Sequence, residues 1–210
     1  MERSFLSMNK AEDNKVFLVI VHTSKLKFED LSLLGFVTKE DIENADRFVN
    51  DNDKVAHLVS SYLKRKYVGT WQVNENGKPI SHEKYFNVSH CERAVVLALA
   101  TWEIGVDVEN IKSIDEDLKR YITTDEEYNK IKTDKDFFEI WTSKESLVKA
   151  DGAGIDRRVT GIPAIPLIGE KSFKGEKYFS RLIQIDELII SVTKKGVEPF
   201  EVVIEKERII

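Results

Sequence analysis

Hydrophobic residues along this chain form two kinds of pattern, short continuous runs and longer stretches with a helical period. A short apolar run bounded by polar or turn residues is typical of a strand buried inside a domain. Runs of this kind occur in both halves of the chain and predict most of its sheet structure. The predicted strands cover residues 15–22, 84–90, 94–102, 104–109, 179–185, 187–192 and 200–205.

Helical spacing and turn residues mark the segments between these strands. Residues 53–66 carry apolar side chains three and four positions apart, which predicts an amphipathic helix. The asparagine and glycine residues of segment 74–79 predict a turn, either a hairpin or a loop excursion. Thr124, followed three residues later by Glu127, predicts that a helix begins in the second half of the chain.

A longer helical pattern covers residues 135–150 and is expected to end at Gly152 and Gly154. Each half of the chain therefore combines helices with a small, mostly antiparallel sheet, which predicts an α+β fold. The chain contains neither a low-complexity linker nor a clear internal repeat. We expect two closely packed halves, residues 1–102 and residues 103–210.

Composition narrows the class of protein. The chain has 210 residues and a formal net charge of -5, which argues against non-specific binding of nucleic acid. Cys91 is the single cysteine, so an internal disulfide framework is excluded and a reducing compartment is favoured. The sequence shows neither a signal-peptide pattern nor an apolar stretch long enough to span a membrane. We expect a cytoplasmic protein that does not bind membranes.

The segment "IGVDVEN", residues 104–110, places two acids on a predicted strand beside an apolar core. Side chains alternate across a strand, so Asp107 and Glu109 point the same way. Two like charges at this spacing raise each other's pKa unless a positive group lies near them. The alternative is a half-buried strand with a solvent-exposed face, where acids commonly alternate with apolar residues.

The helix predicted for residues 135–150 carries a third acid in an unusual place. Phe138, Trp141, Glu145 and Val148 share one helical face, so the carboxylate interrupts an apolar stripe. Lys149 lies four residues after Glu145, and a surface ion pair is the simpler explanation. Three carboxylates that meet would instead form an all-oxygen site suited to Mg²⁺. The cysteine and histidine spacing does not predict a zinc site.

The segment "NVSHCE" offers a serine, a histidine and a cysteine in succession. Adjacent residues on a strand point to opposite faces, so Ser89 and His90 are poorly placed for direct proton transfer. A serine hydrolase is therefore not favoured. The same argument applies to Cys91, for which an ordinary half-buried thiol is the simpler interpretation.

Three motifs together resemble a known family. "FNVSH", "IGVDVEN" and "WTSKESLVKADGAG" occur in this order and resemble the signature motifs of the 4'-phosphopantetheinyl transferases, specifically the larger surfactin-synthetase-activating type. Weaker matches are "GKP" at residues 77–79 and Arg47 with Phe48, followed by Asp53. The resemblance covers about residues 47 to 155.

The resemblance implies an enzyme and a reaction. Such enzymes transfer the 4'-phosphopantetheine arm of coenzyme A to a serine of an acyl or peptidyl carrier protein and release adenosine 3',5'-bisphosphate. It also implies two similar α/β halves related by a pseudo-twofold axis, with the active site in the cleft between them. The larger class acts as a monomer and favours a role in secondary-metabolite biosynthesis.

The resemblance assigns roles to individual residues. It implies one Mg²⁺ held by Asp107, Glu109 and Glu145 against the pyrophosphate of coenzyme A. Glu145, or a water that it holds, would take the proton from the carrier serine, and Lys149 would neutralise the departing phosphate. Asp107, Glu145 and Lys149 are thus the expected catalytic residues. The expected coenzyme contacts are Arg47, Lys78, Ser89, His90, Lys144 and Lys149.

The sequence departs from the family pattern at two places. Glu92 stands where a glycine is common, and the acidic segment at residues 41–46 replaces basic residues that precede the Arg-Phe pair. We expect the 3'-phosphate of coenzyme A to be held differently, with Lys54 or His57 as alternatives.

Two other functions stay open at this point. A degenerate member could bind coenzyme A or a carrier protein without transfer, and a metal-dependent phosphohydrolase could use a similar carboxylate set. A carrier protein would have to dock on an acidic chain through apolar contacts and local basic patches. The candidate patch residues are Lys112, Lys119 and Arg120.

Overall fold

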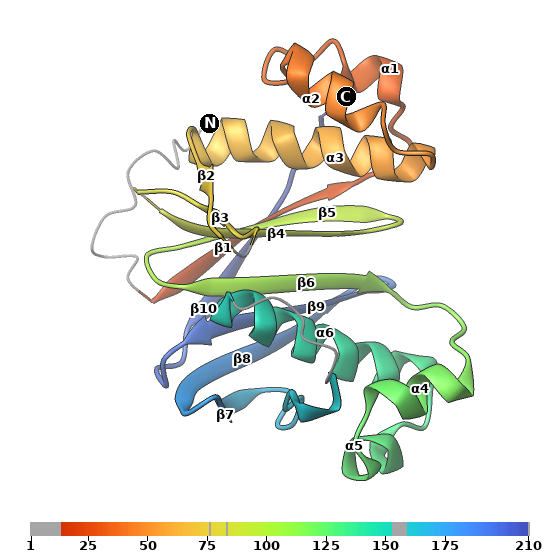
Figure 1. Cartoon of the computed structure of the whole chain (residues 1–210), viewed down its shortest axis with the longest axis vertical. Helices are drawn as coiled ribbons and strands as arrows, with labels where there is room; N and C mark the ends of the chain where they lie inside the picture. Colours follow the sequence, from red (N-terminus) through yellow and green to blue (C-terminus); the bar gives the residue numbers. More distant parts are fainter. Residues whose placement is uncertain (1–13, 76, 83, 153–158, 210) are drawn as a thin grey trace.

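The computed structural model describes residues 14–75, 77–82, 84–152 and 159–209. It shows two four-stranded sheets, one above the other, with a long helix on the outer side of each (Figure 1). The predicted α+β architecture is confirmed. The strands are β1 Lys15–His22, β2 Gln72–Val73, β3 Pro79–Ile80, β4 Tyr85–Cys91, β5 Ala94–Ala100, β6 Ile104–Asn110, β7 Gly169–Phe173, β8 Glu176–Ile185, β9 Leu188–Lys195 and β10 Glu201–Lys206. The helices are α1 Phe28–Leu31, α2 Lys39–Ala45, α3 Asp51–Leu63, α4 Glu116–Ile122, α5 Asp125–Lys130 and α6 Asp134–Asp151.

The first sheet has the strand order β10-β1-β5-β4 and is covered by α3. Its strands β1 and β5 are buried on both faces, which explains why their sequences are almost continuously apolar. The helix predicted over residues 53–66 is α3, which begins at Asp51, directly after its N-cap Asn50. It continues into a π turn, Lys64–Val68, and ends at Gly69, whose φ of +88° suits glycine.

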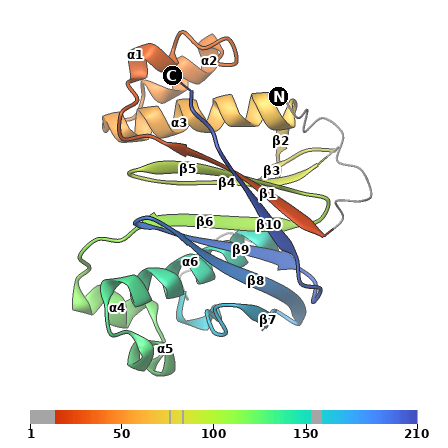
Figure 2. The same cartoon turned by 180° about the vertical axis from the view of Figure 1, so that it is seen from behind.

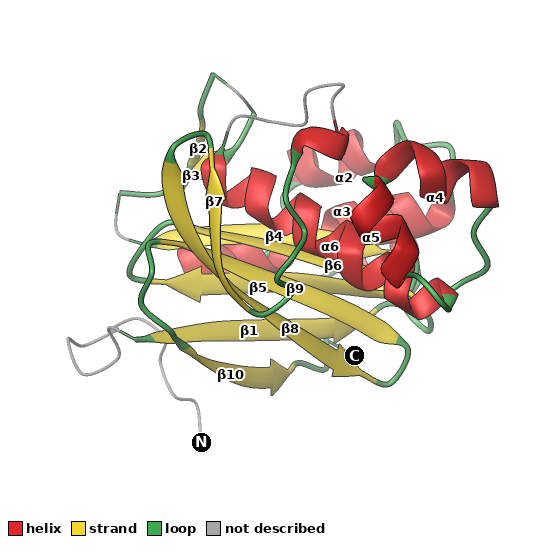
Figure 3. Ribbon diagram, turned by 90° about the horizontal axis from the view of Figure 1, so that it is seen from below, coloured by secondary structure: helices red, strands yellow, loops and turns green. Residues whose placement is uncertain are grey.

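The strand β10 joins the first sheet although it lies at the far end of the chain. It pairs in parallel with β1, beginning with Lys15 opposite Glu201 (Figures 2 and 3). Glu207 follows β10 and accepts hydrogen bonds from Tyr62 at 2.9 Å and from Tyr67. The C-terminal segment is thus tied to the N-terminal sheet and helix, and the division at residues 102 and 103 stays a prediction.

The second sheet has the order β6-β9-β8-β7, and every neighbouring pair in it is antiparallel. Its inner face packs against the first sheet through apolar residues that include Leu18, Val96, Val106 and Ile190. These residues are 0% exposed and form the core that joins the two sheets. Within the described part of the chain, the helices are too short or too polar to cross a membrane.

The helix α6 covers the outer face of the second sheet. It confirms the helix predicted over residues 135–150 and opens with a capping box between Thr133 and Asp136. It ends at Gly152, whose left-handed conformation (φ +78°) closes the last turn. Gly154, the second expected stop residue, lies outside the described residues.

Two short helices, α4 and α5, connect β6 to α6. The helix start predicted from Thr124 and Glu127 is confirmed, because the two residues form a reciprocal capping box at the start of α5. The turn predicted for residues 74–79 is also confirmed as the connection between β2 and β3. This hairpin lies beside β4, at one end of the boundary between the two sheets.

Candidate functional site

Three polar side chains meet where β4, β6 and α6 come together. Ser89 on β4 donates a hydrogen bond to Asp107 Oδ1 on β6 at 2.8 Å. The ammonium of Lys149 on α6 lies 2.6 Å from the same oxygen and 2.9 Å from Ser89 Oγ. The three groups form a closed triangle, which we call the seam cluster. Strand alternation predicted this outcome in part, because the Ser89 hydroxyl faces Asp107 and not His90.

The local structure explains why Lys149 reaches Asp107. Gly105 lies against the backbone of α6, and a Cβ there would lie 2.9 Å from the carbonyl carbon of Lys149. Only a residue without a side chain lets the helix approach the strand so closely. Lys149 therefore contacts β6 directly, and the ion pair that the structure records for it joins it to Asp107 and not to Glu145. The simpler explanation, a surface ion pair between Glu145 and Lys149, is therefore wrong.

Asp107 is buried, with only 4% of its surface exposed. The alternative of a solvent-exposed strand face is therefore wrong for this residue. A buried carboxylate needs a counter-charge or hydrogen-bond donors, and Lys149 and Ser89 supply both to Oδ1. The other oxygen, Oδ2, is also buried, and no described residue donates a hydrogen bond to it. One buried acceptor of the seam cluster thus has no hydrogen-bond donor among the described residues.

The other two carboxylates are coupled to the seam cluster by their charges. Burial, together with the negative charge of Asp107, raises the pKa of Glu145 to about 7, while Lys149 opposes the shift. Burial and the negative charge of Asp107 also raise the pKa of Glu109. The Trp141 indole N–H donates a hydrogen bond to Glu109 at 3.2 Å, which opposes this rise. Burial is the main cause of both shifts, and the negative charge of Asp107 adds to each of them.

A divalent cation would supply the missing positive charge. Within the described residues, however, no group of three or more histidine, cysteine or acidic side chains is arranged to hold a metal ion. The donors nevertheless fit a hard cation, because all are carboxylate oxygens and Asp107 Oδ2 has no partner among the described residues. The ligand set of Asp107, Glu109 and Glu145 therefore stays a prediction.

His90 and Cys91 follow Ser89 at the end of β4. Loss of solvent around the ring and the positive charge of Lys149 lower the pKa of His90, so its imidazole is neutral at pH 7. Cys91 is a half-buried free thiol whose pKa is raised by burial, as expected for an unreactive cysteine. His90 therefore offers the region a neutral donor or acceptor rather than a fixed charge.

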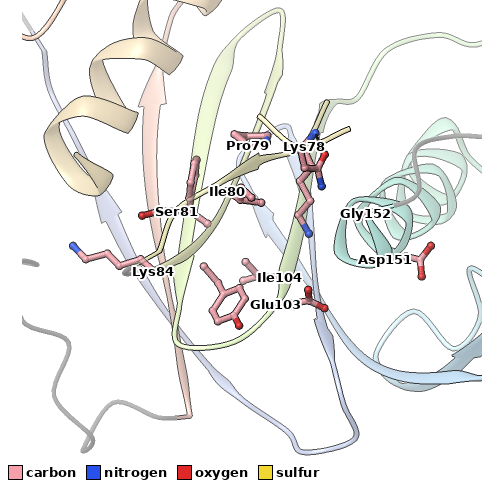
Figure 4. Close-up of a pocket in the computed structure, with 12 residues that line it drawn as sticks. Lys78, Pro79, Ile80, Ser81, Lys84, Glu103, Ile104, Asp151 and Gly152 are labelled. Atoms are coloured by element: carbon pink, nitrogen blue, oxygen red, sulfur yellow. Dashed lines mark hydrogen bonds between the residues drawn. The ribbon is translucent and has the colours of Figure 1, made fainter. Parts of the chain in front are cut away.

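A pocket of about 190 Å³ lies at the end of α6, between the β2–β3 hairpin and the first residues of β4 and β6 (Figure 4). Lys78 reaches from the hairpin toward Gly152 and donates to the Ala150 carbonyl at 3.4 Å. Burial lowers the pKa of Lys78, while the negative charges of Glu103 and Asp151 oppose that shift. The pocket and the seam cluster thus border the same three elements, β4, β6 and α6.

The structure does not join Arg47 to the seam cluster. Arg47 lies in the exposed turn between α2 and α3, and no interaction among the described residues connects it with Asp107 or Lys149. Of the two alternatives, Lys54 pairs with Asp46 at 2.9 Å. Burial and the positive charge of Lys64 lower the pKa of His57, while the negative charge of Asp41 opposes that shift.

Lys144 lies on the other side of α6, away from the seam cluster. It is 1% exposed, and its ammonium contacts Glu127 at 2.8 Å and the Val159 carbonyl at 3.1 Å. Glu127 also accepts the backbone N–H of Ala164, so the pair joins α5, α6 and the following loop. The predicted contact of Lys144 with the coenzyme has no support in this arrangement.

A second lysine, Lys171 on β7, lies close to this buried pair. It is 3% exposed and donates to Ser143, and burial lowers its pKa from 10.5 to about 7 despite the nearby charge of Glu127. A lysine whose folded pKa is depressed binds fewer protons in the folded state between the two values. Its contribution to stability therefore rises with pH from about 7 to about 10.5.

Lys171→Met tests this buried charge. We expect the variant to unfold at higher urea concentration at pH 7, with a free energy of unfolding raised by roughly 1 kcal/mol or more, because the cost of burying an extra cation is removed. The gain should shrink as the pH rises toward 10. Urea denaturation at several pH values measures it, with the exposed Lys177→Met on β8 as control; a gain that does not depend on pH would contradict the assignment.

The sequence patterns missed two residues that shape the site. Asn87 carries no charge, but its amide oxygen accepts a hydrogen bond from the backbone N–H of Val106, next to Asp107, at 2.9 Å. The sequence shows Gly105 only as part of a motif, although its missing side chain lets α6 approach β6 closely. Strand alternation could have placed Asn87 beside Ser89, whereas the close approach at Gly105 leaves no local signal.

Comparison with known proteins gives one family model and several relatives. The model of the 4'-phosphopantetheinyl transferase superfamily matches residues 103–182, which contain Asp107, Glu109, Glu145 and Lys149. The 4'-phosphopantetheinyl transferase gsp of Aneurinibacillus migulanus is 32% identical over 136 residues, which cover 57% of this chain and 57% of gsp.

Two Bacillus proteins give similar matches. The 4'-phosphopantetheinyl transferase Sfp of Bacillus subtilis (strain 168) is 26% identical over 160 residues, 67% of this chain and 71% of Sfp. The 4'-phosphopantetheinyl transferase ffp of Bacillus subtilis is 30% identical over 142 residues, 59% of this chain and 63% of ffp. The matched segment thus spans less than two thirds of both gsp and ffp.

Proposed function

We propose, since this chain belongs to the 4'-phosphopantetheinyl transferase superfamily, that it transfers the 4'-phosphopantetheine arm of coenzyme A to a carrier-protein serine. The acceptor is an acyl or peptidyl carrier protein in its apo form, and adenosine 3',5'-bisphosphate is the second product. The observation that carries the proposal is the seam cluster, where Lys149 and Ser89 converge on Asp107 beside a Glu145 that is half-ionised near pH 7.

The chemistry needs a base, a cation at the leaving group and an aligned nucleophile. Glu145, ionised above its pKa of about 7, would accept the proton of the carrier serine hydroxyl as its oxygen bonds to phosphorus. The bond from that phosphorus to the adenosine bisphosphate breaks, and the ammonium of Lys149 would stabilise the departing phosphate. Mg²⁺ bound by Asp107, Glu109 and Glu145 would supply further positive charge toward the phosphate oxygens.

The coenzyme would lie along the boundary of the two sheets. Ser89 and His90 on β4 are proposed to contact its phosphates, and Lys78 its nucleotide end, because the pocket at Lys78 borders the same strands. Arg47 is proposed as a further nucleotide contact. The presence of two helix-on-sheet layers is the basis for proposing halves 1–102 and 103–210 related by a pseudo-twofold axis, with the site in a cleft between them, although β10 of the second half joins the first sheet.

The proposed protein is a monomer of the cytoplasm that serves secondary-metabolite biosynthesis. Its single cysteine agrees with a reducing compartment. Among the proposed carrier-docking residues, Lys119 pairs with Asp134 at 2.8 Å and Arg120 lies over the Tyr128 ring. Lys112 is therefore the cation of this patch that we expect to matter most for a carrier protein.

Mass measurement of a carrier protein tests the proposed transfer directly. The chain is incubated with coenzyme A, Mg²⁺ and an apo carrier protein, and the carrier is expected to gain the phosphopantetheine arm. Free phosphate released without carrier modification would instead indicate a phosphohydrolase. Tight binding of coenzyme A without either product would indicate a degenerate binding protein.

The role of Glu145 predicts a pH dependence. The carboxylate can accept a proton only when it is ionised, so the turnover number at low Mg²⁺ should rise with pH through about 7. Saturating Mg²⁺ should move this rise to lower pH, because a bound cation favours the ionised form. Glu145→Gln should lose at least about 100-fold in turnover and show no such rise.

Glu139→Gln is the matched control for this prediction. Glu139 lies on the same helix, and its ion pair among the described residues is with Lys135 one turn away, at 3.4 Å. Its variant should keep the turnover number and the pH profile of the original chain. A Glu145→Gln variant with the original pH profile would remove Glu145 from the role of base.

A further inference from the structure

The strands β4 and β6 run side by side although they belong to different sheets. Each is the edge of its own sheet, because backbone ladders join β4 to β5 and β6 to β9. Side chains, not a ladder, must therefore hold the two edges in register. The seam cluster lies across this boundary, so its geometry depends on how the two edges are held together.

Asn87 makes one of these connections. Its side chain is 5% exposed, and its amide oxygen accepts the backbone N–H of Val106 at 2.9 Å. Two residues along β4, Ser89 donates to Asp107 at 2.8 Å. Residues two apart on a strand share a face, so Asn87 and Ser89 lie on the same face of β4. This face contacts two consecutive residues of β6: the backbone of Val106 and the side chain of Asp107.

The two contacts have different strengths as constraints. Ser89 bonds to the carboxylate of Asp107, and that side chain can rotate. Asn87 instead bonds to the backbone N–H of Val106, the residue before Asp107, and so holds the strand itself. On the other side of Val106, Gly105 lies against α6. The backbone that carries Asp107 is thus fixed from both directions, by α6 at Gly105 and by β4 at Val106.

We propose that Asn87 is a positioning residue for the reaction: its amide oxygen holds the β6 backbone at Val106 and thereby aims the Asp107 carboxylate at Lys149 and Ser89. This inference rests on the proposed function of the same site. Without the amide oxygen, the buried Val106 N–H loses its partner, and β6 can relieve that loss only by shifting or admitting water. Asp107 moves with the backbone, and small displacements of catalytic groups lower turnover strongly.

Asn87→Leu tests the inference, because leucine has a similar volume and no acceptor. Hydrogen exchange of the Val106 amide, measured by nuclear magnetic resonance, should become at least about tenfold faster than in the original chain. Turnover should fall by roughly 10-fold to 100-fold, while the KM for coenzyme A should change much less. Thr123→Val is the control, because Thr123 is also buried and its hydroxyl donates to the Lys119 carbonyl of α4, at 2.7 Å.

Asn87→Asp provides the rescue variant. In so buried a place the carboxyl group should be protonated, so that its carbonyl oxygen can accept the Val106 N–H as the amide does. Exchange at Val106 should then stay within about threefold of the original rate. This readout needs neither coenzyme A nor a carrier protein, which separates it from the test of the proposed function.

Three results would overturn the inference. Unchanged exchange at Val106 in Asn87→Leu would show that the contact does not hold the backbone, whether or not the chain transfers phosphopantetheine. Faster exchange with unchanged turnover would show that the contact has no effect on Asp107. An equal loss of turnover in Thr123→Val would show that general destabilisation, and not position, causes the effect. Absence of transfer by the original chain would instead reject the proposed function.

Discussion

Gly105→Ala is expected to destabilise the chain by at least about 3 kcal/mol, at the upper end of the cost of overpacking. The added Cβ would lie 2.9 Å from the Lys149 carbonyl carbon and closer still to the Ser146 oxygen and the Ala150 nitrogen. All three are backbone atoms, which cannot rotate away as a side chain can. The helix must therefore move off β6, and Lys149 loses its contact with Asp107.

Urea denaturation at pH 7 measures this effect, together with the carrier-modification assay. Gly35→Ala is the control, because a Cβ at Gly35 meets nothing within 4 Å. The control should stay within about 0.5 kcal/mol of the original chain. A Gly105→Ala variant with unchanged stability and turnover would mean that α6 does not lie against β6 at this point.

Asp107→Asn is expected to lower turnover by at least about 100-fold while the fold remains. The change keeps the shape of the side chain but removes the charge that balances Lys149. It also removes a ligand that Mg²⁺ is proposed to need, since a neutral amide oxygen binds a hard cation more weakly than a carboxylate. Circular dichroism and the carrier assay measure the two parts of this prediction.

Asp125→Asn is the matched control for charge. Asp125 is an exposed acid in the first turn of α5, so its replacement should leave turnover unchanged and cost only a few tenths of a kcal/mol. The Asp107→Asn variant should also need more Mg²⁺ for half-maximal rate. Turnover equal to that of the original chain would reject both the metal site and the role of Asp107.

Much of the architecture could be predicted from the pattern of apolar residues. The predicted strands at residues 15–22, 94–102 and 104–109 correspond to β1, β5 and β6, and the helix at residues 135–150 to α6. These elements are predictable because burial on one or both faces selects apolar residues with a fixed period. Caps such as Thr124 with Glu127 add a local signal of helix ends.

The pairing of segments that lie far apart in the sequence was harder to predict. The apolar strand near the C-terminus was predicted, but its parallel pairing with β1 was not, because the partner lies almost the whole chain away. Lys144 was placed near the coenzyme, yet its ammonium pairs with Glu127. Helical spacing predicts the direction in which a side chain leaves the helix axis. Which residues Lys144 meets in that direction depends on how α5 and the loop after α6 pack against the helix.

By itself, the sequence determined which residues could do the chemistry: acids on one face of a strand, an acid within an apolar helical stripe, and a lysine one turn later. These follow from the periods of the strand and the helix, which are local properties of the backbone. Only the tertiary structure decided that Lys149 pairs with Asp107 and that Asn87 holds Val106. Such contacts join separate elements, and their distances depend on close packing such as that at Gly105, which the pattern of residues in one element does not reveal.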